Sequence, residues 1–199
     1  MRVIAGTAGG IPLVCPRWEG VRPTMDQVRA AIFSSLAERV PGARVLDLFA
    51  GTGGLGIEAL SRGARSATFV ERDRRAAECV RKNLAATRLS EGAEVVCLDV
   101  KTFLQRRADR PDAVPFDLIF ADPPYTAGDQ KEDFATALLG NAALVRALAS
   151  DGLFILEKSP RHPVALDANG WMPIRQKRYG TTEVVFLRRE DDLPPIDPP

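Results

Sequence analysis

The feature that most constrains the fold is a regular alternation of short apolar runs and amphipathic segments that starts at Ala43. The apolar runs are predicted to be strands, at 44–49, 66–71, 94–98, 116–121 and 152–157. The segments between them are predicted to be helices, at 54–62, 74–86, 102–107 and 132–148. Strands that alternate with helices form a parallel sheet with both faces covered. A hairpin predicted at 171–179 and 183–188 completes this sheet with antiparallel strands. The expected fold class is therefore α/β, a doubly wound and mostly parallel sheet.

A smaller unit precedes this alternation. Two short apolar runs, 2–5 and 11–14, surround a glycine-rich turn and predict a hairpin. A helix is predicted to follow, with Thr24 as its N-cap and Gln27 completing a capping box. The end of the chain has little to bury and is rich in acidic residues and proline. We therefore divide the chain into an extension at 1–42, a main domain at 43–189 and a flexible tail at 190–199.

Composition excludes several classes of protein. No apolar run approaches the length of a membrane span, and residues 1–10 lack the apolar core of a signal peptide, so we expect a cytoplasmic protein without a membrane partner. Cys15, Cys79 and Cys97 share no metal-ligand spacing, and His162 is the single histidine, so we expect no metal site. The net charge is only +1, but basic residues gather in the first and last segments of the chain. That distribution suits phosphate contacts around a central pocket, or a solvated basic surface.

The predicted strand at 116–121 runs directly into Asp122-Pro123-Pro124-Tyr125. Proline is excluded from strand interiors, so the tetrapeptide begins a rigid turn that presents a carboxylate, a backbone carbonyl and an aromatic face. The Asp122 carboxylate and the Pro123 carbonyl can accept hydrogen bonds from an exocyclic amine. Stacking of a base on Tyr125 contributes about 1–3 kcal/mol. The tetrapeptide indicates methylation of a nucleobase amine, and an ordinary strand-ending turn is the alternative.

A glycine-rich segment follows the first predicted strand. Gly51, Gly53 and Gly56 match the pattern G-x-G-x-x-G before a helix N-terminus, where glycine permits a tight turn and a close approach of a ligand. The same pattern is typical of dinucleotide-binding domains, in which an acid such as Glu71 binds the ribose. The glycines alone do not separate the two kinds of cofactor.

Four carboxylates distinguish between these cofactors. Asp47, Glu71, Asp99 and Asp122 lie at or near the carboxyl ends of four successive predicted strands. In a doubly wound sheet those ends form the ligand-binding edge, so we expect the four side chains to converge. That many negative charges would repel a diphosphate. They favour S-adenosylmethionine, which carries a sulfonium and an ammonium group and no phosphate.

With these motifs, nearly the whole chain resembles the RsmD family, bacterial 16S rRNA guanine-N2-methyltransferases with the class I, S-adenosylmethionine-dependent fold. The resemblance rests on five segments, which are Arg22-Pro23-Thr24 with Val28-Arg29, residues 47–53, residues 56–64, Glu71 and residues 122–125. It implies that 43–189 is a methyltransferase domain and that 1–42 contacts RNA. It also implies a cofactor site in which Glu71 holds the ribose hydroxyls and Asp99 the adenine edge. The methionine part would be held by Asp47, Phe49, Ala50, Gly51, Thr52 and Gly53.

The resemblance further implies the substrate side of the site. Asp122, Pro123, Pro124 and Tyr125 would carry catalysis, with Tyr125 stacked on an unpaired or flipped base. Arg22, Thr24 and Arg29 would join Tyr125 in binding the substrate. The partner would be 16S rRNA within a partly assembled small ribosomal subunit. The sequence itself is silent on oligomeric state, and a monomer is the default expectation. Three alternatives stay open: an adenine-N6 methyltransferase acting on DNA or RNA, an NAD-linked oxidoreductase, and an RNA-binding module without catalysis.

Overall fold

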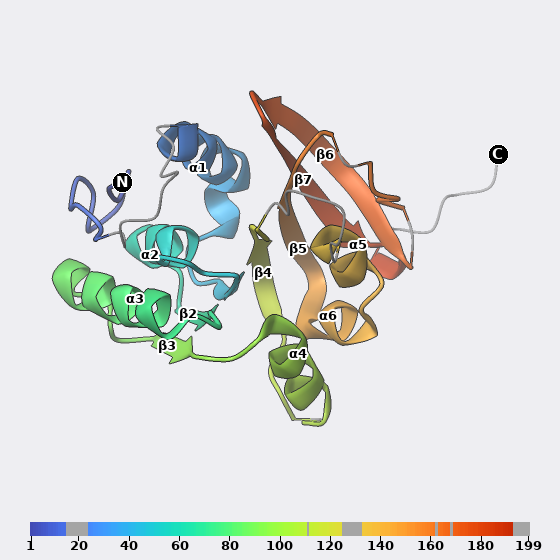
Figure 1. Cartoon of the computed structure of the whole chain (residues 1–199), viewed down its shortest axis with the longest axis horizontal. Helices are drawn as coiled ribbons and strands as arrows, with labels where there is room; N and C mark the ends of the chain where they lie inside the picture. Colours follow the sequence, from blue (N-terminus) through green and yellow to red (C-terminus); the bar gives the residue numbers. More distant parts are fainter. Residues whose placement is uncertain (15–23, 111, 125–132, 162, 168, 193–199) are drawn as a thin grey trace.

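The computed structural model describes residues 1–14, 24–110, 112–124, 133–161, 163–167 and 169–192, which contain a seven-stranded sheet of order β3-β2-β1-β4-β5-β7-β6 (Figure 1). Its strands are β1 Arg44–Leu48, β2 Ser66–Val70, β3 Ala93–Val96, β4 Phe116–Ala121, β5 Leu148–Lys158, β6 Trp171–Tyr179 and β7 Thr182–Arg189. Strands β1 to β5 pair in parallel, and β7 lies antiparallel between β5 and β6. The predicted fold class and the closing hairpin are therefore confirmed.

Helices cover both faces of this sheet. They are α1 Thr24–Leu36, α2 Gly54–Ser61, α3 Arg74–Thr87, α4 Val100–Ala108, α5 Phe134–Leu139 and α6 Ala142–Ala147, with 3-10 turns at Ala37–Arg39 and Glu190–Asp192. One hydrophobic cluster packs the sheet against α1, α2 and α3, and a second packs it against α4, α5 and α6 (Figure 1). Successive strand residues alternate between the clusters, as Val45 and Leu46 do in β1. Each face of the sheet can thus be assigned from the sequence alternation.

One predicted helix is wrong. The segment 132–148 is not continuous, because α5 ends before Gly140 and α6 starts after Asn141. The Asn141 side chain accepts hydrogen bonds from the backbone N–H groups of Ala143 (2.8 Å) and Leu144 (3.3 Å), which makes it the N-cap of α6. Glycine indicates the end of one helix and asparagine the start of the next, but the apolar periodicity on both sides of the pair hid this helix boundary.

The N-terminal segment docks on α2. Residues 1–14 form a turn closed by one antiparallel bridge, between Arg2 and Pro12. The fully buried Glu58 carboxylate of α2 accepts hydrogen bonds from the backbone N–H groups of Ile4 (2.7 Å) and Ala5 (3.0 Å). Val3 and Leu13 belong to the same hydrophobic cluster as β1. The described part of the extension therefore shares its core with the sheet.

The helices of the described ranges are too short or too polar to cross a membrane.

Candidate active site

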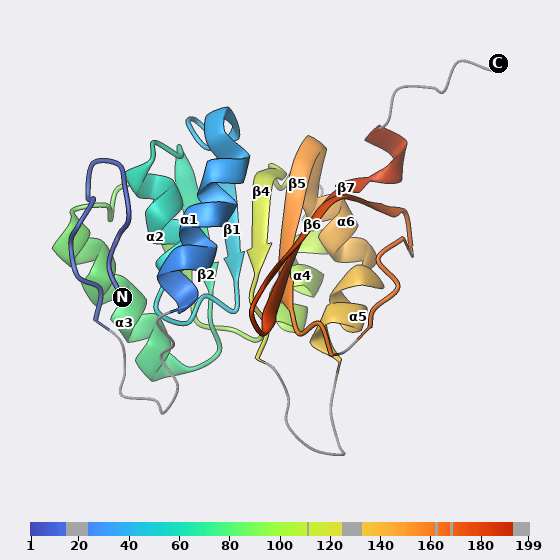
Figure 2. The ribbon, with the colours of Figure 1, turned by 90° about the horizontal axis from the view of Figure 1, so that it is seen from above.

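The carboxyl ends of β1, β2 and β4 bring three of the predicted site carboxylates to one edge of the sheet. Figure 2 shows β1 and β4 ending on the same side of the molecule. Asp47 lies within β1, and Glu71 and Asp122 directly follow β2 and β4. The charges of Asp122 and Glu71 both act on Asp47 and raise its pKa. Three of the four predicted carboxylates therefore share one electrostatic environment.

Asp47 is the most deeply buried of these carboxylates. Its side chain is 2 % exposed, and one oxygen, Oδ2, accepts a hydrogen bond of 2.8 Å from the backbone N–H of Gly56. Burial raises the pKa of Asp47 to about 8, the Gly56 hydrogen bond partly opposes that rise, and the charges of Asp122 and Glu71 add to it. A positively charged ligand group at this edge would favour the ionised carboxylate. The site is thus suited to a cation.

The glycine loop bends as the sequence requires. Gly51 and Gly53 have φ values of 56° and 80°, in the left-handed region that glycine adopts without strain, and Gly53 is the N-cap of α2. Phe49 also has a positive φ, of 58°. A Cβ atom on Gly56 would lie 2.3 Å from Cε1 of Phe69 in β2. The first two glycines therefore shape the turn, and the third allows α2 to pack closely on the sheet.

Glu71 ties this loop to the end of β2. Its Oε2 accepts a hydrogen bond of 2.9 Å from the backbone N–H of Gly51, and its Oε1 accepts one of 2.8 Å from the backbone N–H of Asp73. A carboxylate offers about four acceptor positions, so both oxygens can also accept from ribose hydroxyl groups. Glu71 is placed to hold the loop and a ligand together.

Asp99 has a clear local role as the N-cap of α4. Its Oδ1 accepts hydrogen bonds from the backbone N–H groups of Lys101 (2.9 Å) and Thr102 (3.4 Å). Its predicted contact with an adenine edge is not tested by this geometry and stays a prediction.

The tetrapeptide at 122–125, which was predicted to carry catalysis, is described as far as Pro124. Asp122 is partly buried, Pro123 is buried and Pro124 is exposed at the end of β4. Tyr125 and its predicted stacking lie outside the described residues.

Sequence reasoning missed Glu157, which lies near the end of β5. Ala121 pairs with Leu156 across β4 and β5, so the next residues, Asp122 and Glu157, are neighbours at the edge. Burial raises the pKa of Glu157 well above its usual value, the charges of Asp122 and Asp47 raise it further, and the charge of Arg29 opposes them. The signal was present in the sequence, because Glu157 closes the fifth predicted strand in the way that the other acids close or follow theirs.

Asn83 is a second residue that the sequence did not reveal. Its fully buried amide donates hydrogen bonds to the carbonyl oxygens of Thr52 (2.9 Å) and Val14 (3.0 Å), and its Oδ1 accepts one from the Val14 N–H (2.7 Å). One side chain of α3 thereby joins the glycine loop to the N-terminal segment. A buried asparagine inside a helical pattern gives no such indication in sequence.

Of the predicted substrate contacts Arg22, Thr24 and Arg29, the structure describes only the side chain of Arg29. Arg22 lies outside the described residues, and the Thr24 side chain is not described. Arg29 is 4 % exposed; it donates hydrogen bonds to the carbonyl oxygen of Arg2 and to Asp26 (3.0 Å), and it lies 3.8 Å from Glu58. Helical spacing places Arg29 on the same inward face as the core residue Ile32. The guanidinium of Arg29 is therefore buried among protein groups, and its predicted role in substrate binding stays a prediction.

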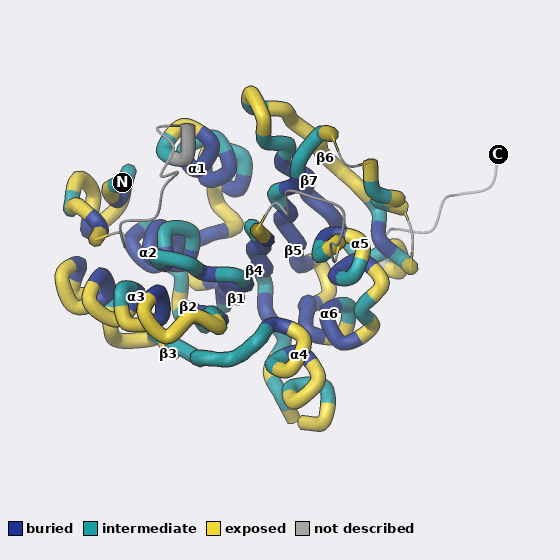
Figure 3. Tube along the Cα trace, in the orientation of Figure 1, coloured by how far each residue is buried: buried dark blue, intermediate teal, exposed yellow. Residues whose placement is uncertain are grey.

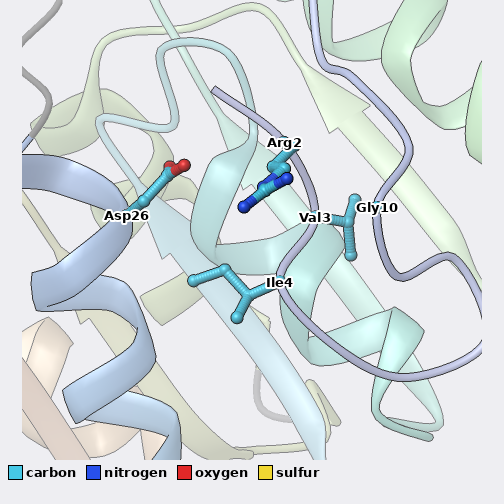
Figure 4. Close-up of a pocket in the computed structure, with 5 residues that line it drawn as sticks. All are labelled: Arg2, Val3, Ile4, Gly10 and Asp26. Carbon is cyan, nitrogen blue, oxygen red and sulfur yellow. The ribbon is translucent and has the colours of Figure 1, made fainter.

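A cavity of about 350 Å³ lies between the N-terminal segment and α1, and none of the carboxylates at the sheet edge lines it (Figure 4). Its lining residues are Arg2, Val3, Ile4, Gly10 and Asp26. Arg2 and Asp26 bring opposite charges to its walls, so the cavity carries no charge preference of its own.

Comparison with known proteins adds to this geometry. The family model "Conserved hypothetical protein 95" matches residues 1–188. Ribosomal RNA small subunit methyltransferase D of Haemophilus influenzae is 40 % identical over 189 residues, which cover 94 % of this chain and 92 % of that protein.

Solved structures share the fold. A hypothetical protein of Thermus thermophilus superposes with a TM-score of 0.76 at 31 % identity, covering 94 % of this chain and 98 % of that one. A Thermus thermophilus 16S rRNA N2 methyltransferase, RsmC, solved in complex with AdoMet and guanosine, gives a TM-score of 0.67 at 24 % identity, covering 87 % of this chain and 44 % of that one. The predicted class I methyltransferase fold is therefore confirmed.

Proposed function

This chain belongs to the RsmD family, and from that premise we propose that it transfers a methyl group from S-adenosylmethionine to the exocyclic N2 amine of a guanine in 16S rRNA. The observation that supports the proposal most is that the charge of Asp122 acts on Asp47, because the proposed amine-binding tetrapeptide and the proposed cofactor loop would then meet at one edge of the sheet. The match to a ribosomal RNA small subunit methyltransferase supports the class of substrate. RsmC, which has the same fold and acts on N2, supports the choice of amine.

The residues at the edge fit S-adenosylmethionine. Burial and neighbouring charges disfavour the ionised form of the Asp47 carboxylate, and a bound cation would favour that form. Glu71 has acceptor positions for hydroxyl groups beside the loop. The cofactor, when bound, supplies a methyl group on a positively charged sulfur. Asp47 and the loop at 49–53 would hold its methionine part, Glu71 its ribose, and Asp99 its adenine edge. This assignment gives each group at the edge a ligand of matching charge or hydrogen-bonding type.

The protein's contribution to the reaction is mainly position. Asp122 and the Pro123 carbonyl accept hydrogen bonds from the guanine amine and orient its nitrogen toward the methyl group. Tyr125 stacks on the flipped base and excludes water from the reacting atoms. The nitrogen gains the methyl group and loses one proton, for which Asp122 is the acceptor. The bond broken would be the one between the methyl group and the sulfur, whose electron pair would stay on the sulfur, so no side chain of this protein would need to act as a covalent nucleophile.

We propose a partly assembled small subunit as the physiological substrate and a monomer as the active form. A chain of 199 residues has little surface with which to read a long RNA, so proteins on the particle would supply part of the specificity. Equal rates on deproteinised rRNA and on the particle would contradict this part of the proposal.

The experiment is methyl transfer from labelled S-adenosylmethionine to small ribosomal particles that lack the modification, followed by digestion to nucleosides and mass identification. We expect label in N2-methylguanosine with the wild type and with the control Asp109→Ala, whose exposed carboxylate lies at the far end of α4. Asp122→Ala should lose it. Label in N6-methyladenosine would instead establish the adenine alternative. Absence of label together with tight binding of NAD(H) would establish the oxidoreductase.

A further inference from the structure

Strand β6 is unusual among the strands because most of its side chains face solvent. The six consecutive residues 173–178 are all exposed, whereas four residues of the adjacent β7 are buried, as Figure 3 shows. Strand β6 is an edge of the sheet and contains Arg175, Lys177 and Arg178. No acidic residue occurs between 171 and 182. The exposed strand therefore presents an excess of positive charge.

Strand register places this charge beside the candidate active site. Glu157 of β5 pairs with Val184 of β7, and Val184 pairs with Lys177 of β6. Neighbouring strands lie about 4.8 Å apart, so the backbone of Lys177 is about 10 Å from that of Glu157. Figure 2 shows the turn of this hairpin at the side where β1 and β4 end.

The alternation of side chains then selects one face. Val184 and Phe186 belong to the cluster under α1, α2 and α3, and their cross-strand partners Lys177 and Arg175 share that face. Val45 and Phe120 belong to the same cluster, so Asp47 and Asp122, two residues further along β1 and β4, project from it as well. Arg175, Lys177 and the proposed catalytic carboxylates thus lie on the same face of the sheet, at the side where β1 and β4 end.

The basic side chains of this region differ in whether they interact with an acidic side chain. Lys158 is paired with Glu183 at 2.5 Å on the opposite face, and the charge of Arg178 also acts on Glu183. Among the described residues, no ion pair includes Arg175 or Lys177. The Lys177 ammonium lies 5.5 Å from the centre of the Tyr179 ring, and that ring packs against the buried cluster. This cation–π contact holds the ammonium near the edge.

We propose that Arg175 and Lys177 bind the phosphate backbone of the RNA strand that carries the target base, on the β5 side of the active site. The inference rests on the proposed function, because the phosphates are those of its substrate. Guanidinium and ammonium groups that lack an internal acid complement phosphate charge. Charge on an edge strand also discourages sheet pairing between copies, but that role requires neither this face nor this level of the strand.

The test compares two double variants with the same change of charge. Arg175→Gln with Lys177→Gln removes the proposed contacts. Arg106→Gln with Arg110→Gln is the control, because both residues are exposed at the end of α4, which runs from the carboxyl edge toward the opposite one. Binding of substrate RNA is measured against salt concentration, together with the kinetics of methyl transfer and the affinity for S-adenosylmethionine.

We expect the hairpin variant to lose about 1.4 from the slope of log affinity against log salt, at about 0.7 for each phosphate contact to a single strand. Its KM for RNA should rise while kcat at saturating RNA and the cofactor affinity stay unchanged, and the control should match the wild type.

The two ways of failing are distinct. If the wild type methylates rRNA and both variants bind RNA with its slope, the proposed function stands and the hairpin inference is overturned. Dimerisation of the hairpin variant in sedimentation, with RNA binding intact, would assign the charges to protection of the edge. If the wild type neither binds nor methylates RNA, the function fails and the inference fails with it.

Discussion

The two halves of the proposed catalytic edge, one proposed to bind the cofactor and the other the substrate, are held in order by different means. In the cofactor half, formed by β1, β2 and β3, the carboxylates accept hydrogen bonds from backbone N–H groups, as Asp47 does from Gly56 and Glu71 from Gly51. In the substrate half, formed by β4, β5 and the hairpin, charged side chains meet across strands, as Lys158 meets Glu183 and Glu157 adjoins Asp122. The first half is preorganised by its backbone, and the second depends on side-chain charge. Substitutions in the two halves should therefore change different measurable quantities.

The largest effect is expected from Asp122→Ala. Loss of a positioned acceptor for the amine should lower kcat by about 10²- to 10⁴-fold. The affinity for S-adenosylmethionine should stay within about twofold of the wild type, because the cofactor half keeps its backbone hydrogen bonds. Single-turnover methyl transfer and calorimetry of cofactor binding measure the two quantities separately. A variant that lost cofactor affinity and rate equally would contradict the division of the edge.

Glu71→Ala should give the reverse pattern. The substitution leaves the Gly51 and Asp73 N–H groups without their acceptor and removes the proposed contacts with the ribose. Charged hydrogen bonds contribute about 1.5–3 kcal/mol each, so the dissociation constant for S-adenosylmethionine should rise by about 10- to 100-fold. At saturating cofactor, kcat should fall by much less. Unchanged cofactor affinity by calorimetry would exclude Glu71 from the cofactor site.

The difference between the halves also explains what the sequence could predict. The glycine loop and its helix were predicted because Gly51, Gly53 and Gly56 act within a few residues of one another. Asn83 was missed because its partners lie in the glycine loop and on the N-terminal segment, and contacts between distant segments are not written in local spacing. Glu157 could have been found, because it closes the fifth predicted strand at the same edge as Asp122.

The sequence also did not reveal the burial of Arg29. Asp26 is a local partner one turn earlier in α1, but Glu58 of α2 and the Arg2 carbonyl come from two other segments that meet Arg29 only in the fold.

Asp47→Asn should change how stability depends on pH. The pKa of Asp47 is about 8 in the folded protein and about 3.9 in an unfolded chain, so the folded state binds the proton more tightly. This group therefore makes the free energy of unfolding fall as pH rises from about 4 to about 8, by up to about 1.4 kcal/mol per pH unit. Asparagine keeps an acceptor for the Gly56 N–H and does not titrate.

Urea unfolding between pH 5 and pH 8 without cofactor measures this dependence. We expect the stability of the variant relative to the wild type to rise across the interval. Parallel curves would show that the Asp47 carboxylate ionises in the folded state as freely as in an unfolded chain.

The smallest effect, and the sharpest test of the substrate half, compares Glu157→Gln with Glu183→Gln on the adjacent strand. The pKa of Glu157 is raised, by burial first and then by Asp122 and Asp47, so its contribution to stability diminishes as pH rises above the ordinary value of a glutamate. Burial also raises the pKa of Glu183, but hydrogen bonds from Lys158 and Gln176 outweigh it and lower the pKa overall. Glu183 therefore stabilises the fold above the ordinary glutamate pKa, and that stabilisation is lost as pH falls through its lowered value. Relative to the wild type, Glu157→Gln should gain stability from pH 5 to pH 8, whereas Glu183→Gln should be destabilised at pH 7 and approach the wild type near pH 4.

Chemical unfolding of both variants between pH 4 and pH 8 measures these two dependences. If both had the same sign, the charges of the substrate half would not divide between the two faces of the sheet as the strand register requires.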